Sequence, residues 1–97
     1  MTITKTIEEG KLLVRLEGRL DSVSAPQLEA TMKEITGAEN IVFDLEKLEY
    51  ISSAGLRVFL SVQKRVNGKG SLNIINSVQD VMEIFEVTGF VDILDIA

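Results

Sequence analysis

Residues 41–66 read IVFDLEKLEYISSAGLRVFLSVQKRV, and this stretch decides the fold. It opens with a continuous apolar run, Ile41-Val42-Phe43, which is typical of a strand that lies centrally in a sheet or is covered on both faces. From about Ser53 to Val66 the apolar side chains recur at helical spacing instead. The segment therefore predicts a buried strand that leads, through a short loop, into a helix. The residues expected on the core side of that helix are Leu56, Val58, Phe59, Leu60, Val62 and Val66.

The residues that follow extend this strand–helix unit. Residues 67–71, NGKGS, form the clearest turn signal in the chain and precede a short apolar strand at 72–75. A third helix is expected to start around Ser77 to Asp80, to turn Val81, Ile84 and Phe85 inward and to end at Gly89. Phe90 to Ile96 is expected to form a last short strand or tail.

The residues before the central stretch predict a hairpin and a first helix. An edge strand around Ile3 and Ile7 and an alternating strand from Leu12 to Gly18 flank a turn at residues 8–11. Ser24-Ala25-Pro26-Gln27 has the form of a helix start, with Ser24 and Gln27 as a capping box and Gly37 as the expected end. The order β-β-α-β-α-β-α, with a possible final strand, predicts a single α/β domain over residues 1–97. Its mixed, partly parallel sheet would have four to five strands and about three main helices.

The charge balance argues against nucleic acid as a partner. The chain carries 10 basic and 15 acidic side chains, for a net charge of −5. Binding to nucleic acid depends on clustered cationic contacts with phosphates, and the largest basic group, Lys64-Arg65 with Lys69, is small. We expect no nucleic-acid binding.

The missing residue types exclude several kinds of chemistry. The sequence has neither cysteine nor histidine, which removes disulfides, thiolate catalysis, Ser-His-Asp triads and zinc sites with sulfur or nitrogen ligands. No carboxylate pair marks a catalytic pocket, so we expect a protein that is not an enzyme and needs no metal or cofactor. The first residues have no apolar signal segment, and no apolar run approaches the roughly 20 residues that span a bilayer. We therefore expect a cytoplasmic protein with no membrane insertion.

Two serines at the start of the second predicted helix are the candidate functional feature. In one interpretation Ser53 only caps the helix by accepting a hydrogen bond from a first-turn amide, worth about 1 kcal/mol. Gly55 is then unexplained, because glycine in a helix costs roughly 0.5–1 kcal/mol relative to alanine. A close approach of another backbone or a ligand would explain it. Tyr50, just before the serines, fits either packing or a partner surface.

In the second interpretation Ser53 is a phosphorylation site. The free amides and the positive dipole end of a helix N-terminus suit a phosphate dianion, and Arg57 one turn further on could partly compensate its charge. Phosphorylation would place about −1.5 to −2 charges on an exposed surface and would disrupt a partner docked there.

At this point the sequence resembles the STAS domain, a family shared by anti-sigma factor antagonists and the cytoplasmic ends of sulphate transporters. Two motifs carry the resemblance, which covers essentially the whole chain: Gly18-Arg19-Leu20-Asp21 followed by Ser24-Ala25, and Asp44-Leu45 leading through Tyr50-Ile51 to Ser52-Ser53-Ala54-Gly55-Leu56. Antagonists typically read Asp-Ser-Ser/Thr-Gly-Leu at the second motif, and the phosphorylated serine stands two residues before the glycine. That position is Ser53 here. Ser52 replaces a common aspartate and is a candidate secondary acceptor.

The resemblance implies a regulatory cycle. The unphosphorylated chain would bind an anti-sigma factor that is also a serine kinase, which frees the sigma factor. Phosphorylation of Ser53 would end the binding, and a PP2C-type phosphatase would restore it. Asp21 matches a family loop aspartate near the phosphorylation site, although a purely turn-forming role is equally open. Arg57, Ser61 and Lys64 on the second helix are the candidate docking surface, and a solvated face with no partner is the alternative for them.

A different function within the same family stays open. The chain would then be a STAS subunit that is not phosphorylated, such as the small partner of a lipid-transport ATPase or part of a stress-sensing scaffold.

Overall fold

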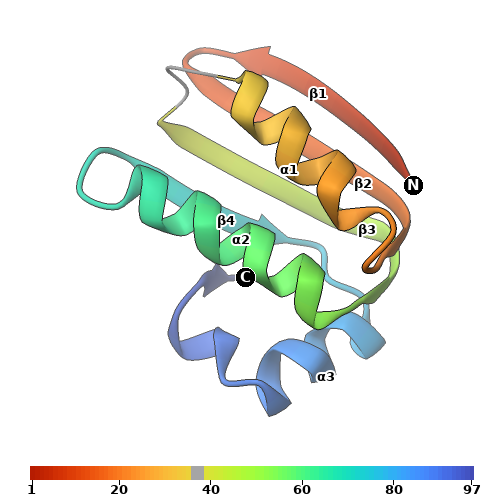
Figure 1. Cartoon of the computed structure of the whole chain (residues 1–97). Coiled ribbons are helices and arrows are strands. Elements are labelled where there is room, and N and C mark those ends of the chain that lie inside the picture. Colours follow the sequence, from red (N-terminus) through yellow and green to blue (C-terminus); the bar gives the residue numbers. More distant parts are fainter. Residues whose placement is uncertain (36–38) are drawn as a thin grey trace.

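A five-stranded sheet forms the framework of the computed structural model, which describes residues 1–35 and 39–97 (Figure 1). The strand order is β1-β2-β3-β4-β5, with β1 antiparallel to β2 and every other neighbouring pair parallel. The predicted mixed α/β fold is therefore confirmed. The elements are β1 (Thr2–Glu8), β2 (Lys11–Leu20), α1 (Ala25–Glu34), β3 (Asn40–Ile51), α2 (Ser53–Val66), β4 (Ser71–Ile75), α3 (Gln79–Val87), the 3₁₀ turn η1 (Phe90–Asp92) and β5 (Asp95–Ile96).

The helices α1 and α2 lie side by side on one face of the sheet (Figure 1). This arrangement follows from the strand order, because crossovers between parallel strands are right-handed and the strands β2, β3 and β4 advance in one direction across the sheet. α3 packs against the same core through Val81 and Phe85. The ring of Phe59 on α2 joins β3 to α3, since its centroid lies 4.8 Å from that of Phe43 and 6.2 Å from that of Phe85.

The hairpin between β1 and β2 turns where the sequence predicts it. Glu8 pairs with Lys11, so the turn has two residues, and both have positive φ: 48° for Glu9 and 80° for Gly10. A two-residue turn of this handedness matches the twist of the flanking strands and favours glycine at its second position.

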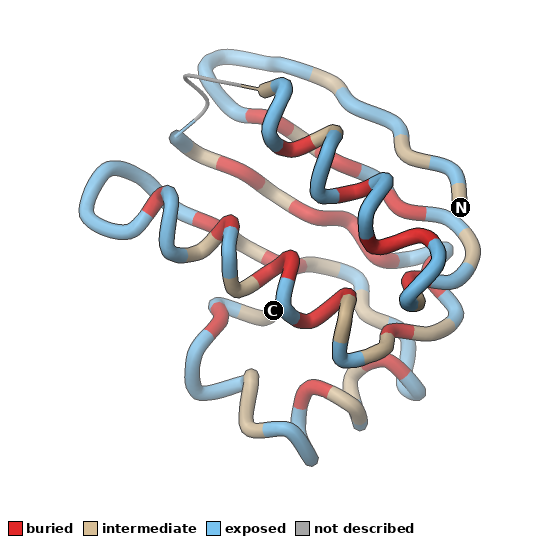
Figure 2. The backbone as a smooth tube through the Cα atoms, in the orientation of Figure 1, coloured by how far each residue is buried: buried red, intermediate tan, exposed pale blue. Residues whose placement is uncertain are grey.

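Burial follows the alternation of β2. Leu12, Val14 and Leu16 are buried beneath the helices, whereas Arg15 and Glu17 are exposed on the opposite face. None of the described residues of β1 is buried, and burial concentrates on β2, β3 and the inner sides of the helices (Figure 2). The central position of β3 explains its continuous apolar run without a second layer of helices.

The third strand is longer than predicted. The expected loop between Leu45 and Ser52 does not form, and β3 continues to Ile51. Its buried side chains Leu45, Leu48 and Ile51 are spaced by three residues, which breaks the period of two that marks a strand. Shifts in the pairing with β2, between Arg15 and Glu17 and between Gly18 and Arg19, absorb the extra residues and keep all three on the core face.

The predicted capping box of the first helix is wrong. α1 begins at Ala25, and Ser24 makes no side-chain cap. The Ser24 hydroxyl donates to the carbonyl oxygen of Arg19 at 2.7 Å instead, and the side-chain amide of Gln27 donates to the carbonyl oxygen of Met1 at 3.4 Å. α1 ends at Glu34, and its predicted last residue, Gly37, lies outside the described residues.

The third helix agrees more closely with the sequence. It begins at Gln79, inside the predicted start, and Gly89 follows its C-terminal cap, Thr88. Among the described residues, no helix combines the length and apolar character needed to cross a membrane.

Candidate phosphoacceptor site

The two sequence motifs meet where β2 and β3 leave the sheet. Leu20 pairs with Ile51 at the carboxyl ends of these parallel strands, and the Ser52 N–H donates to the Leu20 carbonyl oxygen at 2.8 Å. Because the segments after β2 and β3 leave from the same edge of the sheet, the loop that follows Leu20 lies beside the start of α2. Residues Ser22, Ala25 and Pro26 line one groove of about 290 Å³ together with Ala54, Arg57 and Val58.

The two serines at the start of α2 have different surroundings. Ser53 is the first residue of α2 and is exposed. Ser52 is the cap residue, and its carbonyl oxygen accepts a hydrogen bond from the Leu56 N–H at 3.0 Å. The Ser52 hydroxyl oxygen is buried and has no hydrogen-bond partner among the described residues. Within the described chain no side chain caps α2. The interpretation of Ser53 as a helix cap is therefore wrong, and of the two hydroxyl groups only that of Ser53 belongs to an exposed residue.

Gly55 is explained by a close approach. A Cβ atom at this position would lie 2.6 Å from Cγ and 2.8 Å from Cδ2 of Leu20, and 3.0 Å from Cγ1 of Ile51. Both neighbours are buried side chains of the core. The first turn of α2 thus lies directly on the ends of β2 and β3, and the missing side chain of Gly55 allows this contact. The sequence suggested a backbone or a ligand at this position, whereas the structure places a leucine side chain there.

Asp21 organises the loop between β2 and α1. Its Oδ1 atom accepts hydrogen bonds from the N–H groups of Val23 at 3.0 Å and Ser24 at 3.1 Å. The Ser24 hydroxyl accepts a hydrogen bond in return from the Asp21 N–H at 3.0 Å. The N–H bonds from Ser24 and Val23, with smaller contributions from the Ser24 hydroxyl and the Arg19 charge, hold the pKa of Asp21 below its ordinary value. The turn-forming role considered for Asp21 is present in the structure.

This loop exposes an apolar side chain that the sequence analysis did not single out. Val23 is 85 % exposed, although Asp21 binds its backbone N–H. Its side chain lies in the short loop between β2 and α1, outside the regular spacing by which a strand or a helix turns its apolar side chains toward the core. An apolar residue between Ser22 and Ser24 in such a loop is the signal that could have revealed it.

The outward side of α2 carries the other predicted docking residues. Arg57, Ser61 and Lys64 are exposed and follow Ser53 at intervals of four, four and three residues, so they share one face of the helix. Arg65 does not belong to this face, because its Nη1 donates to the Met32 carbonyl oxygen of α1 at 2.7 Å. Tyr50 is half-buried beneath the Arg19 guanidinium, which lies 4.4 Å from the ring centroid. The structure thus gives Tyr50 a packing contact.

Comparison with known proteins identifies the family. The profile of the STAS domain matches residues 2–97, almost the whole chain. The chain belongs to the STAS domain family. BtrV of Bordetella bronchiseptica, assigned as an anti-sigma factor antagonist, is 39 % identical to this STAS domain over 100 % of the chain and 86 % of BtrV. The anti-sigma-B factor antagonist of Staphylococcus aureus is 28 % identical, over 99 % of the chain and 92 % of that protein.

A solved structure has the same fold. The unphosphorylated form of the anti-sigma factor antagonist SpoIIAA superposes with a TM-score of 0.84 at 21 % identity, over 99 % of this STAS domain and 88 % of SpoIIAA. The phosphorylated form of SpoIIAA, from Bacillus, gives a TM-score of 0.75 at 20 % identity, over 99 % and 91 % of the two chains.

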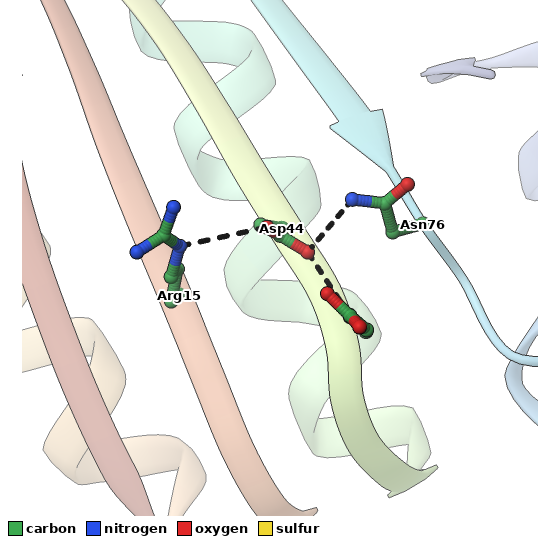
Figure 3. A network of polar contacts seen from close by, with 4 residues as sticks. Arg15, Asp44 and Asn76 are labelled. Carbon is green, nitrogen blue, oxygen red and sulfur yellow. Dashed lines mark hydrogen bonds and ion pairs between the residues drawn. The ribbon is translucent and has the colours of Figure 1, made fainter.

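A second polar cluster lies on the sheet face opposite the helices and is separate from the serine site. Asp44 of the STAS domain is 9 % exposed, and its carboxylate lies 3.6 Å from Nε of Arg15 on β2 (Figure 3). It also accepts hydrogen bonds from the Asn76 side-chain amide at 3.2 Å and from the Glu46 N–H at 3.1 Å. Asp44 therefore connects β2, β3 and the residue after β4. Within the described residues, no three histidine, cysteine or acidic side chains are grouped to hold a metal ion.

Proposed function

We propose that this STAS domain is a cytoplasmic anti-sigma factor antagonist whose binding is controlled by phosphorylation of Ser53. The unphosphorylated chain binds an anti-sigma factor that is also a serine kinase, and the sigma factor is released. The kinase then transfers the γ-phosphoryl group of ATP to the Ser53 hydroxyl, whose proton is lost, and ADP leaves. A PP2C-type phosphatase hydrolyses the phosphoserine and restores the binding form. The chain is a substrate in this cycle and not a catalyst.

The observation that carries the proposal is the different burial of the two adjacent serines. A kinase must bring the acceptor hydroxyl to its bound nucleotide, so the acceptor has to be accessible. Ser53 is exposed at the first position of α2, whereas the hydroxyl of Ser52 is buried. The residue that the family motif designates is thus the one that a kinase can reach, and Ser52 is a poor secondary acceptor.

The surroundings of Ser53 suit a switch that acts at the surface. The start of α2 offers amides without intrahelical partners and the positive end of the helix dipole, so a phosphate can be accepted there without unfolding the helix. The added charge of about −1.5 to −2 would meet any partner that contacts the same surface. Val23 exposes an apolar side chain in the loop between β2 and α1, and Arg57, Ser61 and Lys64 extend the surface along α2.

The relatives support the same proposal. BtrV and the Staphylococcus aureus protein are named as antagonists of anti-sigma factors, and SpoIIAA is known in unphosphorylated and phosphorylated forms.

Intact-mass measurement tests the proposal directly. The purified chain is mixed with Mg-ATP and, in turn, each anti-sigma factor of the source organism that has a kinase domain. The wild type and Ser52→Ala should each gain one phosphate with the cognate kinase, whereas Ser53→Ala should gain none. The proposal is wrong if no kinase modifies the wild type, or if Ser53→Ala is modified as fast as the wild type.

A charged substitution tests the switch. Ser53→Asp should weaken binding of the cognate anti-sigma factor in a calorimetric titration. Its free energy of unfolding should stay within about 1 kcal/mol of the wild type, because an acidic residue is tolerated in the first turn of a helix. A variant that binds as tightly as the wild type would contradict a switch based on charge.

A further inference from the structure

Arg57 is a free cation one helical turn from the phosphoacceptor. It is exposed, and no ion pair or side-chain hydrogen bond involves it among the described residues. The other charged group on the same groove, Glu29 of α1, is already paired with Lys33 at 3.6 Å. Asp21 across the loop is occupied by the N–H groups of Val23 and Ser24. The guanidinium of Arg57 therefore has no established partner in the unmodified chain.

Helix geometry places this guanidinium within reach of Ser53. Residues four apart in a helix lie on one face, and each Cα–Cβ bond tilts toward the helix N-terminus, so an arginine at position 57 can extend back over the turn that holds Ser53. Lys64 is too distant for the same role, because eleven residues at 1.5 Å per residue separate it from Ser53 by about 16 Å along the axis. Arg65 is held by the Met32 carbonyl oxygen.

We propose that Arg57 is shared between two anions in turn: a carboxylate of the docked partner before phosphorylation, and the phosphate on Ser53 after it. The inference rests on the proposed function and adds a mechanism to it. Phosphorylation would then weaken docking twice, once by repelling the partner's carboxylate and once by withdrawing the cation that binds it. Guanidinium suits both roles because its fork of N–H donors binds either carboxylate or phosphate in a bidentate manner.

The groove beside Arg57 defines the chemistry of the partner segment. Its walls, where α1 and α2 face each other, are formed mainly by the small or apolar side chains Ala25, Pro26, Ala54 and Val58. Arg57 supplies the unpaired positive charge of this groove, while the whole chain has a net charge of −5. The partner segment that fits this groove therefore has an acidic residue next to an apolar one. Its apolar side chain would lie in the groove, and its carboxylate would pair with the Arg57 guanidinium.

A titration that needs no partner tests the phosphate half of the proposal. Phosphoserine is incorporated at position 53 during translation, and its second ionisation is followed by ³¹P NMR. The pKa of a free phosphoserine is about 6, and an ion pair at this helical spacing should make the value about 0.3 higher in Arg57→Met than in the wild type. Lys69→Met, which removes a charge from the turn after α2, is the matched control and should leave the value unchanged. Equal values in Arg57→Met and the wild type would overturn the proposal.

A binding cycle tests the carboxylate half. The anti-sigma factor that phosphorylates the wild type is titrated against the wild type and Arg57→Met, each with and without phosphate on Ser53. Arg57→Met should weaken binding of the unphosphorylated chain about five- to tenfold, since one partner of an interfacial charge pair is lost. Phosphorylation of Ser53 should then weaken binding of the anti-sigma factor by a factor several-fold smaller in Arg57→Met than in the wild type. Arg57→Lys, which keeps the charge without the fork, should lie between them.

The outcomes separate this inference from the proposed function. If phosphorylation weakens binding by the same factor in both chains, Arg57 is not shared, although the switch itself stands. If no anti-sigma factor binds the wild type, the proposed function fails, and with it the exchange proposed for Arg57. The ³¹P titration then reports only whether the phosphate pairs with Arg57.

Discussion

Gly55→Ala is the substitution for which the structure reverses the expectation from helix propensity. Alanine is favoured over glycine in a helix interior by about 0.8–1 kcal/mol, so propensity alone predicts a more stable protein. The structure predicts the opposite, because the new methyl group would lie 2.6 Å from Cγ of Leu20 and 3.0 Å from Cγ1 of Ile51. Both side chains are at most 1 % exposed, and Cγ of Leu20 is a branch point that cannot swing away as a chain end can.

The size of the effect follows from the two opposing terms. Inserting a methyl group into a packed core typically costs 1–3 kcal/mol, and the propensity gain offsets part of this. The difference is a net loss of about 0–2 kcal/mol in the free energy of unfolding, and the contact with the buried branch point of Leu20 favours the upper end of this range. A loss of that size lowers the Tm of a domain of this size by up to about 15 °C. Urea and thermal denaturation, followed by circular dichroism, measure the change in the free energy of unfolding and in the Tm.

Two comparisons identify the contact as the cause. Ser61→Ala, on the exposed side of the same helix, should be neutral or stabilising by a few tenths of a kcal/mol. Gly55→Ala should cost less in a Leu20→Ala background, because the space vacated by Leu20 accommodates the methyl group. The reasoning is refuted if Gly55→Ala stabilises the wild-type chain, or if the two substitutions are additive.

Three further predictions concern the loop, the sheet face and the helix pair. The pKa of Asp21 is lowered by folding, so its carboxylate stabilises the protein above the ordinary value of 3.8, and this contribution is lost as the pH falls through the lowered pKa. Asp21→Asn should therefore be less stable than the wild type in urea denaturation at pH 7, and a gap that does not narrow in acid would contradict this account. Asp44→Ala should lower the free energy of unfolding by about 1–3 kcal/mol, because two hydrogen bonds and an ion pair lose their acceptor, while Glu46→Ala on the exposed neighbour should change it by less than about 0.5 kcal/mol. Arg65→Gln should cost about 1 kcal/mol through the lost bond to the carbonyl oxygen of α1, as measured by thermal denaturation; an effect no larger than that of Lys69→Gln would argue against that bond.

The order of the elements could be predicted because it depends on local patterns. The alternation of Leu12, Val14 and Leu16, the turn around Gly10 and the helical spacing from Ser53 to Val66 are each visible within about a dozen residues. Right-handed crossovers place α1 and α2 on one face only because β2, β3 and β4 advance in one direction across the sheet, and that strand order is visible only in the structure. The prediction failed at β3, where the pairing with β2 sets the spacing of the buried residues, and at Ser24, whose hydroxyl bonds to the preceding strand and not to its own helix.

The sequence by itself determined the element order and the family motifs, and the resemblance carried by those motifs made Ser53 the predicted acceptor. It could not distinguish the environments of Ser52 and Ser53, which are the same residue type at adjacent positions. Only the tertiary structure decided this, because the first turn of α2 packs through Gly55 onto Leu20, a residue of a different motif. That contact, together with the hydrogen bond from the Ser52 N–H to the Leu20 carbonyl oxygen, fixes how the chain enters α2. With the entry fixed, one serine hydroxyl is buried and its neighbour is left exposed, since burial depends on residues distant in the sequence.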